Sequence, residues 1–248
     1  MNILSAFRKK QEPPVCSAVI LAAGSAERMG EDKVMMNLGA MPVLAHTLAA
    51  FQDSPSVDEI IVVTRMEKVE EIADLCHKYG MDKVSKVIGG GATRTESALA
   101  GVSEVKASAK LIAIHDGARP LVSQELISRT VSAAKEHLAA VPVIASTDTL
   151  KIVDDDNFIA ATVDRTNTVR VQTPQVFDAV IIKGALSNAA KKGLTYTDDC
   201  AAVACMGVKT YAVAGDEDNI KLTTPRDALI AAAILKDRGD YLEDRTRV

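Results

Sequence analysis

Short runs of β-branched residues alternate with longer amphipathic segments along most of this chain, and that alternation limits the folds open to it. The short runs are typical of buried strands, whereas the longer segments repeat apolar residues with the period of a helix. A strand–helix alternation of this kind predicts a mostly parallel sheet with helices on both faces, an α/β fold of the Rossmann-like type. The expected strands cover residues 15–21, 59–64, 83–88, 111–114, 141–145 and 208–213, and the expected helices cover 42–51, 66–79, 93–105, 123–137, 178–191, 197–206 and 224–237.

The alternation breaks between residues 147 and 169, where two short β-rich runs flank an acidic turn at 154–157. We predict a β-hairpin arm at about 147–169 that protrudes from the α/β body. An isolated hairpin is only marginally stable in water, so we expect the arm to pack against a second copy of the chain. Because 248 residues are close to the upper limit for one core, residues 15–248 are expected to form one domain that follows a flexible tail at 1–14.

Composition argues against several classes of function. With a net charge of −4 and a pI of about 5.6, the chain has no overall field that would attract nucleic acid or an anionic membrane. Only 3% of the residues are aromatic, which disfavours a stacking surface for single-stranded nucleic acid. No segment is apolar over the length of a membrane span. The four cysteines form no metal-binding or paired pattern and lie in apolar runs, which predicts buried thiols and a reducing, cytoplasmic compartment.

The loops expected at the carboxyl ends of the strands carry the candidate binding residues, because ligands bind at that edge of an open α/β sheet. The first loop, residues 21–33, reads LAAGSAERMGEDK. Its small residues let backbone N–H groups approach a phosphate, and Arg28 and Lys33 add two positive charges. The loop matches neither the P-loop nor the dinucleotide-binding glycine pattern, so those two enzyme classes are excluded. Taken alone, it could also be a turn with two solvated cations.

Two later loops have the same ambiguity. Residues 89–94, GGGATR, precede a helix and would suit a base or phosphate, or form a plain flexible connection. In the loop HDGARP, Asp116 is placed at a strand end where it could hold Mg²⁺, or it could pair with Arg119 in a turn. His115 is expected to be structural, because attack of one phosphate on another needs no general base. Arg165 and Lys221 are single cations that support no conclusion by themselves.

Taken together, these segments resemble the 2-C-methyl-D-erythritol 4-phosphate cytidylyltransferase family of the non-mevalonate isoprenoid pathway. The resemblance extends from about residue 18 to residue 234 and covers nearly the whole chain. It depends on seven motifs in a fixed order, which are LAAGSAERMG…K, GGGATR…S, HDGARP, DT-x-K, TVDR…TPQVF, TDD and DNIKLT.

The resemblance implies that the chain joins CTP and 2-C-methyl-D-erythritol 4-phosphate, with Mg²⁺ as cofactor, to give 4-diphosphocytidyl-2-C-methyl-D-erythritol and pyrophosphate. It assigns Arg28 and Lys33 to the attacked α-phosphate, and Arg165 and Lys221 to the incoming phosphate. The implied nucleotide-binding positions are Ala22, Ala23, Gly24, Gly91, Ser97, Asp116 and Gly117, with Asp116 also associated with the metal. The implied substrate contacts are Arg119, Thr149 and Thr197. The arm is implied to form a homodimer, so that the neighbouring subunit completes each site.

Departures from the family pattern keep other functions open. The loop between Arg28 and Lys33 is two residues shorter than usual, and Asp32 and Val34 flank the lysine in place of Pro and Gln. A nucleotide-binding module without catalysis is therefore one alternative. A cytidylyltransferase for another polyol phosphate, such as ribitol 5-phosphate, is a second. A sugar-1-phosphate or molybdopterin nucleotidyltransferase shares the first loop, but the later motifs argue against it.

Overall fold

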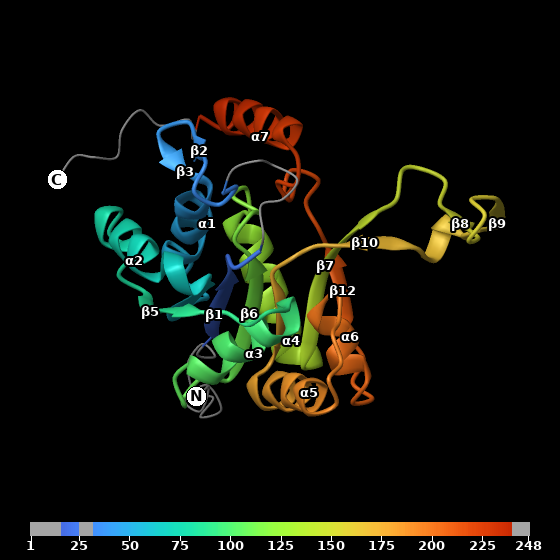
Figure 1. Ribbon diagram of the computed structural model, residues 1–248, viewed down its shortest axis with the longest axis horizontal. Coiled ribbons are helices and arrows are strands. Elements are labelled where there is room, and N and C mark those ends of the chain that lie inside the picture. Colours follow the sequence, from blue (N-terminus) through green and yellow to red (C-terminus); the bar gives the residue numbers. More distant parts are fainter. Residues whose placement is uncertain (1–15, 25–31, 240–248) are drawn as a thin grey trace, which may run out of the picture.

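A mixed eight-stranded sheet forms the centre of the computed structural model, which describes residues 16–24 and 32–239 (Figure 1). Seven strands lie in the order β10-β7-β11-β6-β1-β4-β5, and β12 pairs with β7. Strands β1, β4, β5 and β6 are parallel to one another, as is β12 to β7, whereas β10 and β11 run antiparallel to the strands that they pair with. The strand bounds are β1 Cys16–Leu21, β4 Glu59–Thr64, β5 Val84–Gly89, β6 Leu111–Asp116, β7 Ala139–Ala145, β10 Val169–Val171, β11 Gln175–Asp178 and β12 Tyr211–Ala214.

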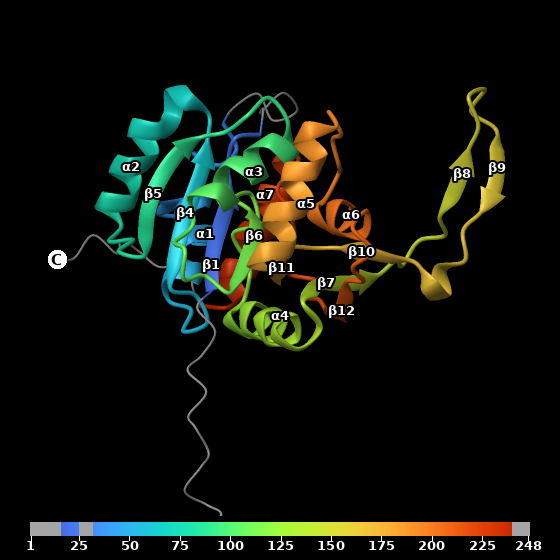
Figure 2. The same cartoon turned by 90° about the horizontal axis from the view of Figure 1, so that it is seen from below.

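Helices cover both faces of the sheet, which confirms the predicted fold class (Figures 1 and 2). Because successive side chains of a strand point to opposite faces, Ala18 and Ile20 of β1 pack on one side and Val19 on the other. The first face carries α1 (Val43–Gln52), α2 (Val69–Lys78) and α4 (Gln124–His137), and the second carries α3 (Arg94–Glu104), α5 (Ala179–Lys191) and α6 (Asp199–Ala204). The last helix, α7 (Pro225–Asp237), closes a third, smaller apolar cluster with Leu38, Leu121 and Leu222.

Capping residues fix where helices α4 and α3 begin. The predicted cap Ser123 accepts a hydrogen bond from the Leu126 N–H at 3.2 Å, at the start of α4. Helix α3 begins with a capping box, in which Thr93 and Glu96 satisfy each other's backbone N–H groups. As a result, α3 begins at Arg94, three residues after the last glycine of the triplet 89–91.

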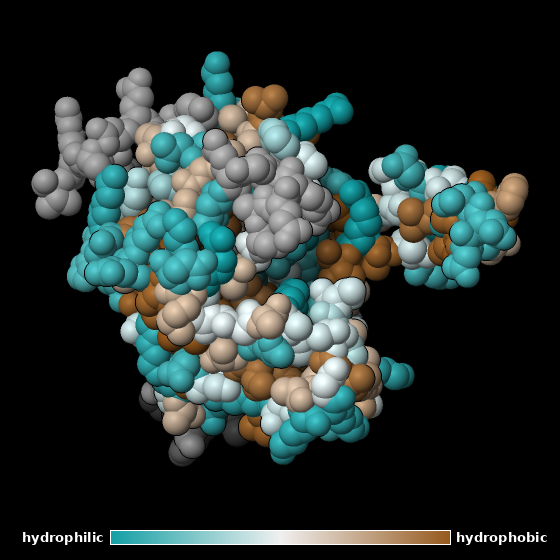
Figure 3. Space-filling model, viewed as in Figure 1, coloured by the Kyte–Doolittle hydropathy of each residue, from teal (hydrophilic) through white to brown (hydrophobic). Residues whose placement is uncertain are grey.

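The predicted arm is present as a hairpin that stands away from the body (Figure 2). Its strands are β8 (Lys151–Val153) and β9 (Ile159–Thr162), followed by the short 3₁₀ helix η3 (Arg165–Asn167) and by β10, which returns to the sheet. Several large apolar side chains of the arm are exposed, including Phe158 at 71% and Ile159 at 66%. In Figure 3 the arm carries brown, hydrophobic patches among polar ones. The described residues of one chain therefore leave these apolar side chains of the arm uncovered.

Several local features differ from the sequence-based expectation. Strand β11 and the small hairpin of β2 (Asn37–Leu38) and β3 (Met41–Pro42) were not predicted, and a 3₁₀ turn, η2 (Met66–Lys68), precedes α2. Helix α6 begins at Asp199 with Asp198 as its cap, so Thr197 lies in the preceding loop rather than in the helix.

The cysteine prediction holds for Cys16 and Cys76, which are buried, but it is wrong for the exposed Cys205. Within the described residues, no helix is long and apolar enough to cross a membrane. The predicted tail at 1–14 lies outside the described residues.

Candidate active site

Three of the predicted binding loops meet at one edge of the sheet. Strands β6, β1, β4 and β5 are adjacent and parallel, so their carboxyl ends point the same way. Backbone hydrogen bonds extend this pairing beyond the strands. The Ala22 N–H donates to the Val63 carbonyl at 2.7 Å, and the Gly117 N–H donates to the Leu21 carbonyl at 2.8 Å. The turns after β1, β5 and β6 are thereby held next to one another.

A cavity of about 380 Å³ lies between these turns. Its lining combines small residues and backbone with three basic side chains and one carboxylate, and consists of Leu21, Ala22, Ala23, Gly24, Lys33, Val34, Gly91, Ala92, Thr93, Arg94, Ser97, Asp116, Ala118 and Lys221. Gly90 allows two walls to approach closely, because a Cβ there would lie 2.7 Å from Ser97 Oγ and 3.1 Å from Ala23 Cβ. The cavity therefore has the two properties that a polyphosphate needs, accessible backbone and positive charge.

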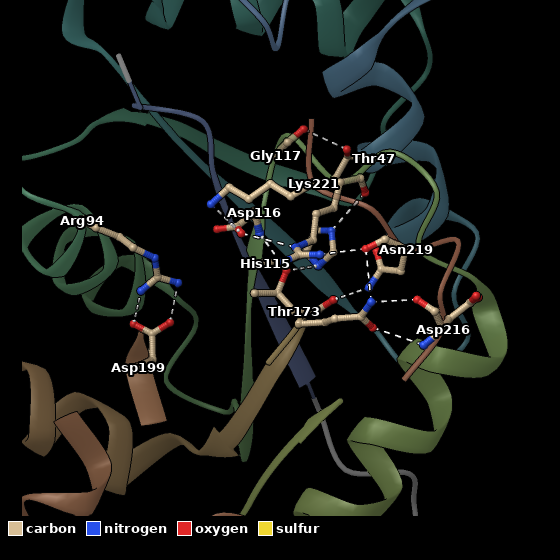
Figure 4. A network of polar contacts seen from close by, with 12 residues as sticks. Thr47, Arg94, His115, Asp116, Gly117, Thr173, Asp199, Asp216, Asn219 and Lys221 are labelled. Atoms are coloured by element: carbon tan, nitrogen blue, oxygen red, sulfur yellow. Dashed lines mark hydrogen bonds and ion pairs between the residues drawn. The ribbon is translucent and has the colours of Figure 1, made fainter. Parts of the chain in front are cut away.

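Asp116 is the electrostatic centre of the cavity (Figure 4). Its Oδ2 atom lies 3.0 Å from Lys221 Nζ and 3.4 Å from Arg119 Nε. Burial by itself would raise the pKa of this carboxyl group, but the charges of Lys221, Arg94 and Arg119 outweigh that effect and hold the pKa well below its usual range. Asp116 is therefore ionised at neutral pH, and it holds the Lys221 side chain at the cavity wall.

His115 lies behind Asp116 and is fully buried. Its Nε2 lies 3.3 Å from the Arg119 carbonyl and its Nδ1 lies 2.9 Å from Thr173 Oγ1, which in turn accepts the Asp116 N–H at 3.1 Å. The Arg119 carbonyl can only accept, so the imidazole is assigned as an Nε2–H donor with Nδ1 accepting from Thr173. Burial lowers the pKa of His115 to about 3. The imidazole is therefore neutral and supports the backbone of Asp116, in agreement with the structural role expected for it.

Arg94 is a cavity residue that the sequence did not single out as a binding residue. Its two Nη atoms donate to both carboxylate oxygens of Asp199, at 2.9 and 2.8 Å, across 105 positions of sequence. Burial raises the pKa of Asp199, and the guanidinium offsets part of that shift. The TDD motif that contains Asp199 was visible in the sequence, but nothing in it indicated which arginine the carboxylate meets.

The structure brings together most of the predicted nucleotide-binding residues but not the predicted substrate contacts. Ala22, Ala23, Gly24, Lys33, Gly91, Ser97, Asp116 and Lys221 all line the cavity. Gly117 and Arg119 lie behind its wall, where the Gly117 carbonyl accepts from Thr47 Oγ1 at 2.9 Å and Arg119 donates to the Asn219 carbonyl at 2.7 Å. Thr149, Arg165 and Thr197 are exposed and do not line the cavity. Arg28 lies outside the described residues.

A larger cavity, of about 950 Å³, lies among α1, α4 and α7, on another part of the molecule. Four carboxylates face it, from Asp53, Glu125, Asp216 and Glu217, against two arginines and no lysine. Excess negative charge disfavours a polyanionic ligand. By volume alone this cavity would be the first candidate for the ligand-binding site. Its charge argues against a polyphosphate ligand, whereas the charge and accessible backbone of the smaller cavity at the sheet edge suit one.

An α/β sheet with a glycine-rich, cationic cavity at its carboxyl edge defines the class of nucleotide-binding enzymes to which nucleotidyltransferases belong. Comparison with known proteins narrows this class. The family model of IspD, 2-C-methyl-D-erythritol 4-phosphate cytidylyltransferase, matches residues 16–237. The relative from Caldanaerobacter subterraneus subsp. tengcongensis, which carries that enzyme name, is 40% identical over 89% of this chain and 98% of its own length.

Solved structures agree with the sequence matches. The crystal structure of 4-diphosphocytidyl-2C-methyl-D-erythritol synthase from Anaerococcus prevotii superposes with a TM-score of 0.81 at 32% identity, covering 91% of this chain and all of that one. The Thermus thermophilus cytidylyltransferase gives a TM-score of 0.72 at 30% identity, covering 88% and 98%. The chain belongs to the 2-C-methyl-D-erythritol 4-phosphate cytidylyltransferase family. It is a nucleotidyltransferase of isoprenoid biosynthesis that uses CTP, and the match does not favour the ribitol phosphate and binding-module alternatives.

Proposed function

We propose that the cavity at the carboxyl edge of the sheet is where CTP meets 2-C-methyl-D-erythritol 4-phosphate, and that its cations carry the catalysis. The observation that supports this most is the placement of Lys33, Lys221 and Asp116 around one cavity with the backbone of 22–24 and Gly91. Lys221 is held by Asp116 at 3.0 Å, so its charge is already oriented before any substrate arrives.

The reaction requires positioning and charge stabilisation more than covalent help from the protein. An oxygen of the substrate phosphate attacks the α-phosphorus of CTP, the bond between the α-phosphorus and the bridging oxygen breaks, and pyrophosphate leaves with that oxygen. Negative charge accumulates on the α-phosphoryl oxygens, and two polyanions must be brought together. In this proposal Lys33, together with Arg28 of the same loop, faces the α-phosphate, while Lys221 and Arg165 orient the attacking phosphate.

Asp116 is proposed to take part in binding Mg²⁺. Asp116 is an ionised carboxylate at the cavity wall, and both of its ion pairs, with Lys221 and with Arg119, use Oδ2. The described residues contain no group of three or more metal-binding side chains, which fits a Mg²⁺ ion held by one carboxylate plus nucleotide phosphate oxygens and water. When bound, the ion neutralises phosphate charge. The residues present are therefore compatible with a metal that enters with the nucleotide.

The second substrate is proposed to bind between two subunits. Arg165 and Thr149 lie on or next to the arm and do not reach the cavity of their own chain. The exposed Ile152, Phe158 and Ile159 give the arm an apolar surface that a second copy could cover. We therefore propose a homodimer in which the arm of one subunit supplies Arg165 to the site of the other.

All four cysteines are free, which supports the further proposal of a cytoplasmic location.

Pyrophosphate release with CTP, methylerythritol phosphate and Mg²⁺ tests the proposed roles. Lys33→Met and Lys221→Met should each lower kcat by at least about a hundredfold, because each removes a preorganised positive charge that stabilises the transition state. Lys191→Met, an exposed lysine at the end of α5, is the matched control and should behave like the wild type. Near-normal turnover of either cavity variant would contradict its role.

Mixed subunits test whether the site is shared. Arg165→Ala and Lys221→Met chains should each be nearly inactive as homodimers. After mixing and refolding, half of the dimers carry one of each chain, and each of these has one intact site, so roughly a quarter of wild-type activity should return. No recovery, or a wild-type mass by light scattering equal to one 26.3 kDa chain, would contradict the shared site.

A further inference from the structure

The first turn of α3 is tied to a segment of chain that lies about a hundred positions later in the sequence. Arg94 donates two parallel hydrogen bonds to Asp199, whose side chain is only 1% exposed. Next to it, the buried Thr95 accepts the Tyr196 N–H on Oγ1 at 3.0 Å. A bidentate guanidinium–carboxylate pair fixes orientation as well as distance. Both ends of the segment 196–199 are therefore fastened to the same helical turn.

A third contact completes this attachment from the sheet. Gln175 is 2% exposed, and its Oε1 accepts the N–H groups of Asp199 at 3.0 Å and of Cys200 at 3.3 Å. The start of α6 is thus held against both α3 and β11. Thr197 lies between the two fastened points, and it is itself exposed. Its position follows from these contacts, since it lies within two residues of Asp199.

The same helical turn also forms part of the nucleotide wall. Thr93, Arg94 and Ser97 line the cavity beside Gly91, and Figure 4 shows Arg94 turned toward Asp199, to one side of Asp116 and Lys221. The positive charge of Arg94 lowers the pKa of Asp116 and so helps to keep that carboxylate ionised. Arg94 therefore forms part of the nucleotide wall and also contacts the segment that carries Thr197.

We propose that Arg94 is a positioning residue that sets Thr197 relative to the nucleotide wall, so that binding of the polyol phosphate depends on the Arg94–Asp199 pair. This inference depends on the proposed function and on the contact of Thr197 with the polyol phosphate that the family resemblance implies. A buried ion pair can also be purely structural, and replacing both partners by apolar groups is then often neutral for stability. The two roles differ in what they predict for kinetics, since a purely structural pair has no reason to alter the KM of one substrate selectively.

The test is Arg94→Lys, which keeps the positive charge but cannot form the bidentate hydrogen bonds to Asp199. We expect the KM for methylerythritol phosphate to rise at least fivefold, while the dissociation constant for CTP, measured by calorimetry without the second substrate, changes less than twofold. Arg226→Lys, exposed on α7, is the matched control and should alter neither. An unchanged KM for the polyol phosphate, or an equal loss of CTP affinity, would overturn the proposal.

A double-mutant cycle separates this inference from the proposed function. Thr197→Val alone should also raise the KM for methylerythritol phosphate, and combining it with Arg94→Lys should add little, because both act through one contact. Additive effects would overturn the positioning role. A Thr197→Val enzyme with a normal KM would instead refute the substrate contact of Thr197. Absence of pyrophosphate release from the wild type would refute the proposed reaction itself.

Discussion

His115 gives the structure a specific acid sensitivity that can be measured apart from catalysis. The imidazole is fully buried, and its pKa falls from 6.5 to about 3 because burial disfavours the charged form. In the unfolded chain the same group takes up a proton as the pH falls below about 6.5. The unfolded state therefore binds more protons than the folded state between about pH 6.5 and pH 3. Stability contributed by neutral His115 is complete above this window and is lost progressively as the pH falls through it.

The magnitude follows from the two protonation equilibria. At pH 5 an imidazole with its ordinary pKa is protonated about 30 times more often than it is neutral, whereas buried His115 remains neutral. The corresponding loss of folding free energy between pH 7 and pH 5 is about 2 kcal/mol. This value changes little if the folded pKa is a unit higher or lower. Asp116 contributes little above pH 5, because its carboxyl is ionised in the folded state and nearly so in the unfolded state.

Urea unfolding at pH 7 and pH 5 measures the effect, with His115→Gln as the comparison. Glutamine can still offer one donor and one acceptor but cannot titrate, so the variant should lose about 2 kcal/mol less than the wild type on acidification. All other titrating groups, including Asp199, are common to both proteins and cancel in the difference. Equal pH dependence of the two proteins would refute the reasoning. An NMR titration in which the His115 ring signals moved between pH 7 and pH 5 would do the same.

The remaining predictions concern close packing at two glycines and the cap of α4. Gly101→Ala should lower the free energy of unfolding by about 1–3 kcal/mol in urea titrations, because its Cβ would overlap Val19 and lie 2.8 Å from Val63 Cγ2 beneath α3. Gly90→Ala should raise the KM for CTP severalfold with a smaller change in melting temperature, because the new Cβ displaces Ser97 at the cavity wall. Ser123→Ala should cost about 1 kcal/mol of stability, since the Leu126 N–H loses its cap; unchanged unfolding would contradict the capping role.

Much of the body of the fold could be predicted because buried parallel strands leave a clear mark in sequence. The run EIIVVT at 59–64 forms β4 with all six residues buried, and apolar positions of 69–78 lie on one face of α2. Strand β11 escaped prediction because its four residues follow Pro174 and its hydrogen-bonding partners, β6 and β7, are distant in sequence. A short strand inserted antiparallel between two others has no local signature.

The cavity was partly predictable for a related reason. Residues that line it through backbone and small side chains, such as Ala23 and Gly91, lie in recognisable turns after strands. Arg94 and Asp199 meet only because α3 and α6 pack on the same face of the sheet. The pairing of Lys221 with Asp116 likewise joins two loops that no local pattern connects. Coordinates are needed to identify which charged side chains pair when they are distant in sequence, whereas the turns that hold them can be recognised from the sequence.

A crystal structure of the protein with CTP and Mg²⁺ tests the central claim most directly, which is that separate strand-end loops form one cationic site for the nucleotide. We expect the triphosphate in the 380 Å³ cavity, in contact with Lys33 and alongside the backbone of 22–24. Nucleotide bound instead in the 950 Å³ cavity among α1, α4 and α7, with the sheet-edge cavity empty, would contradict it.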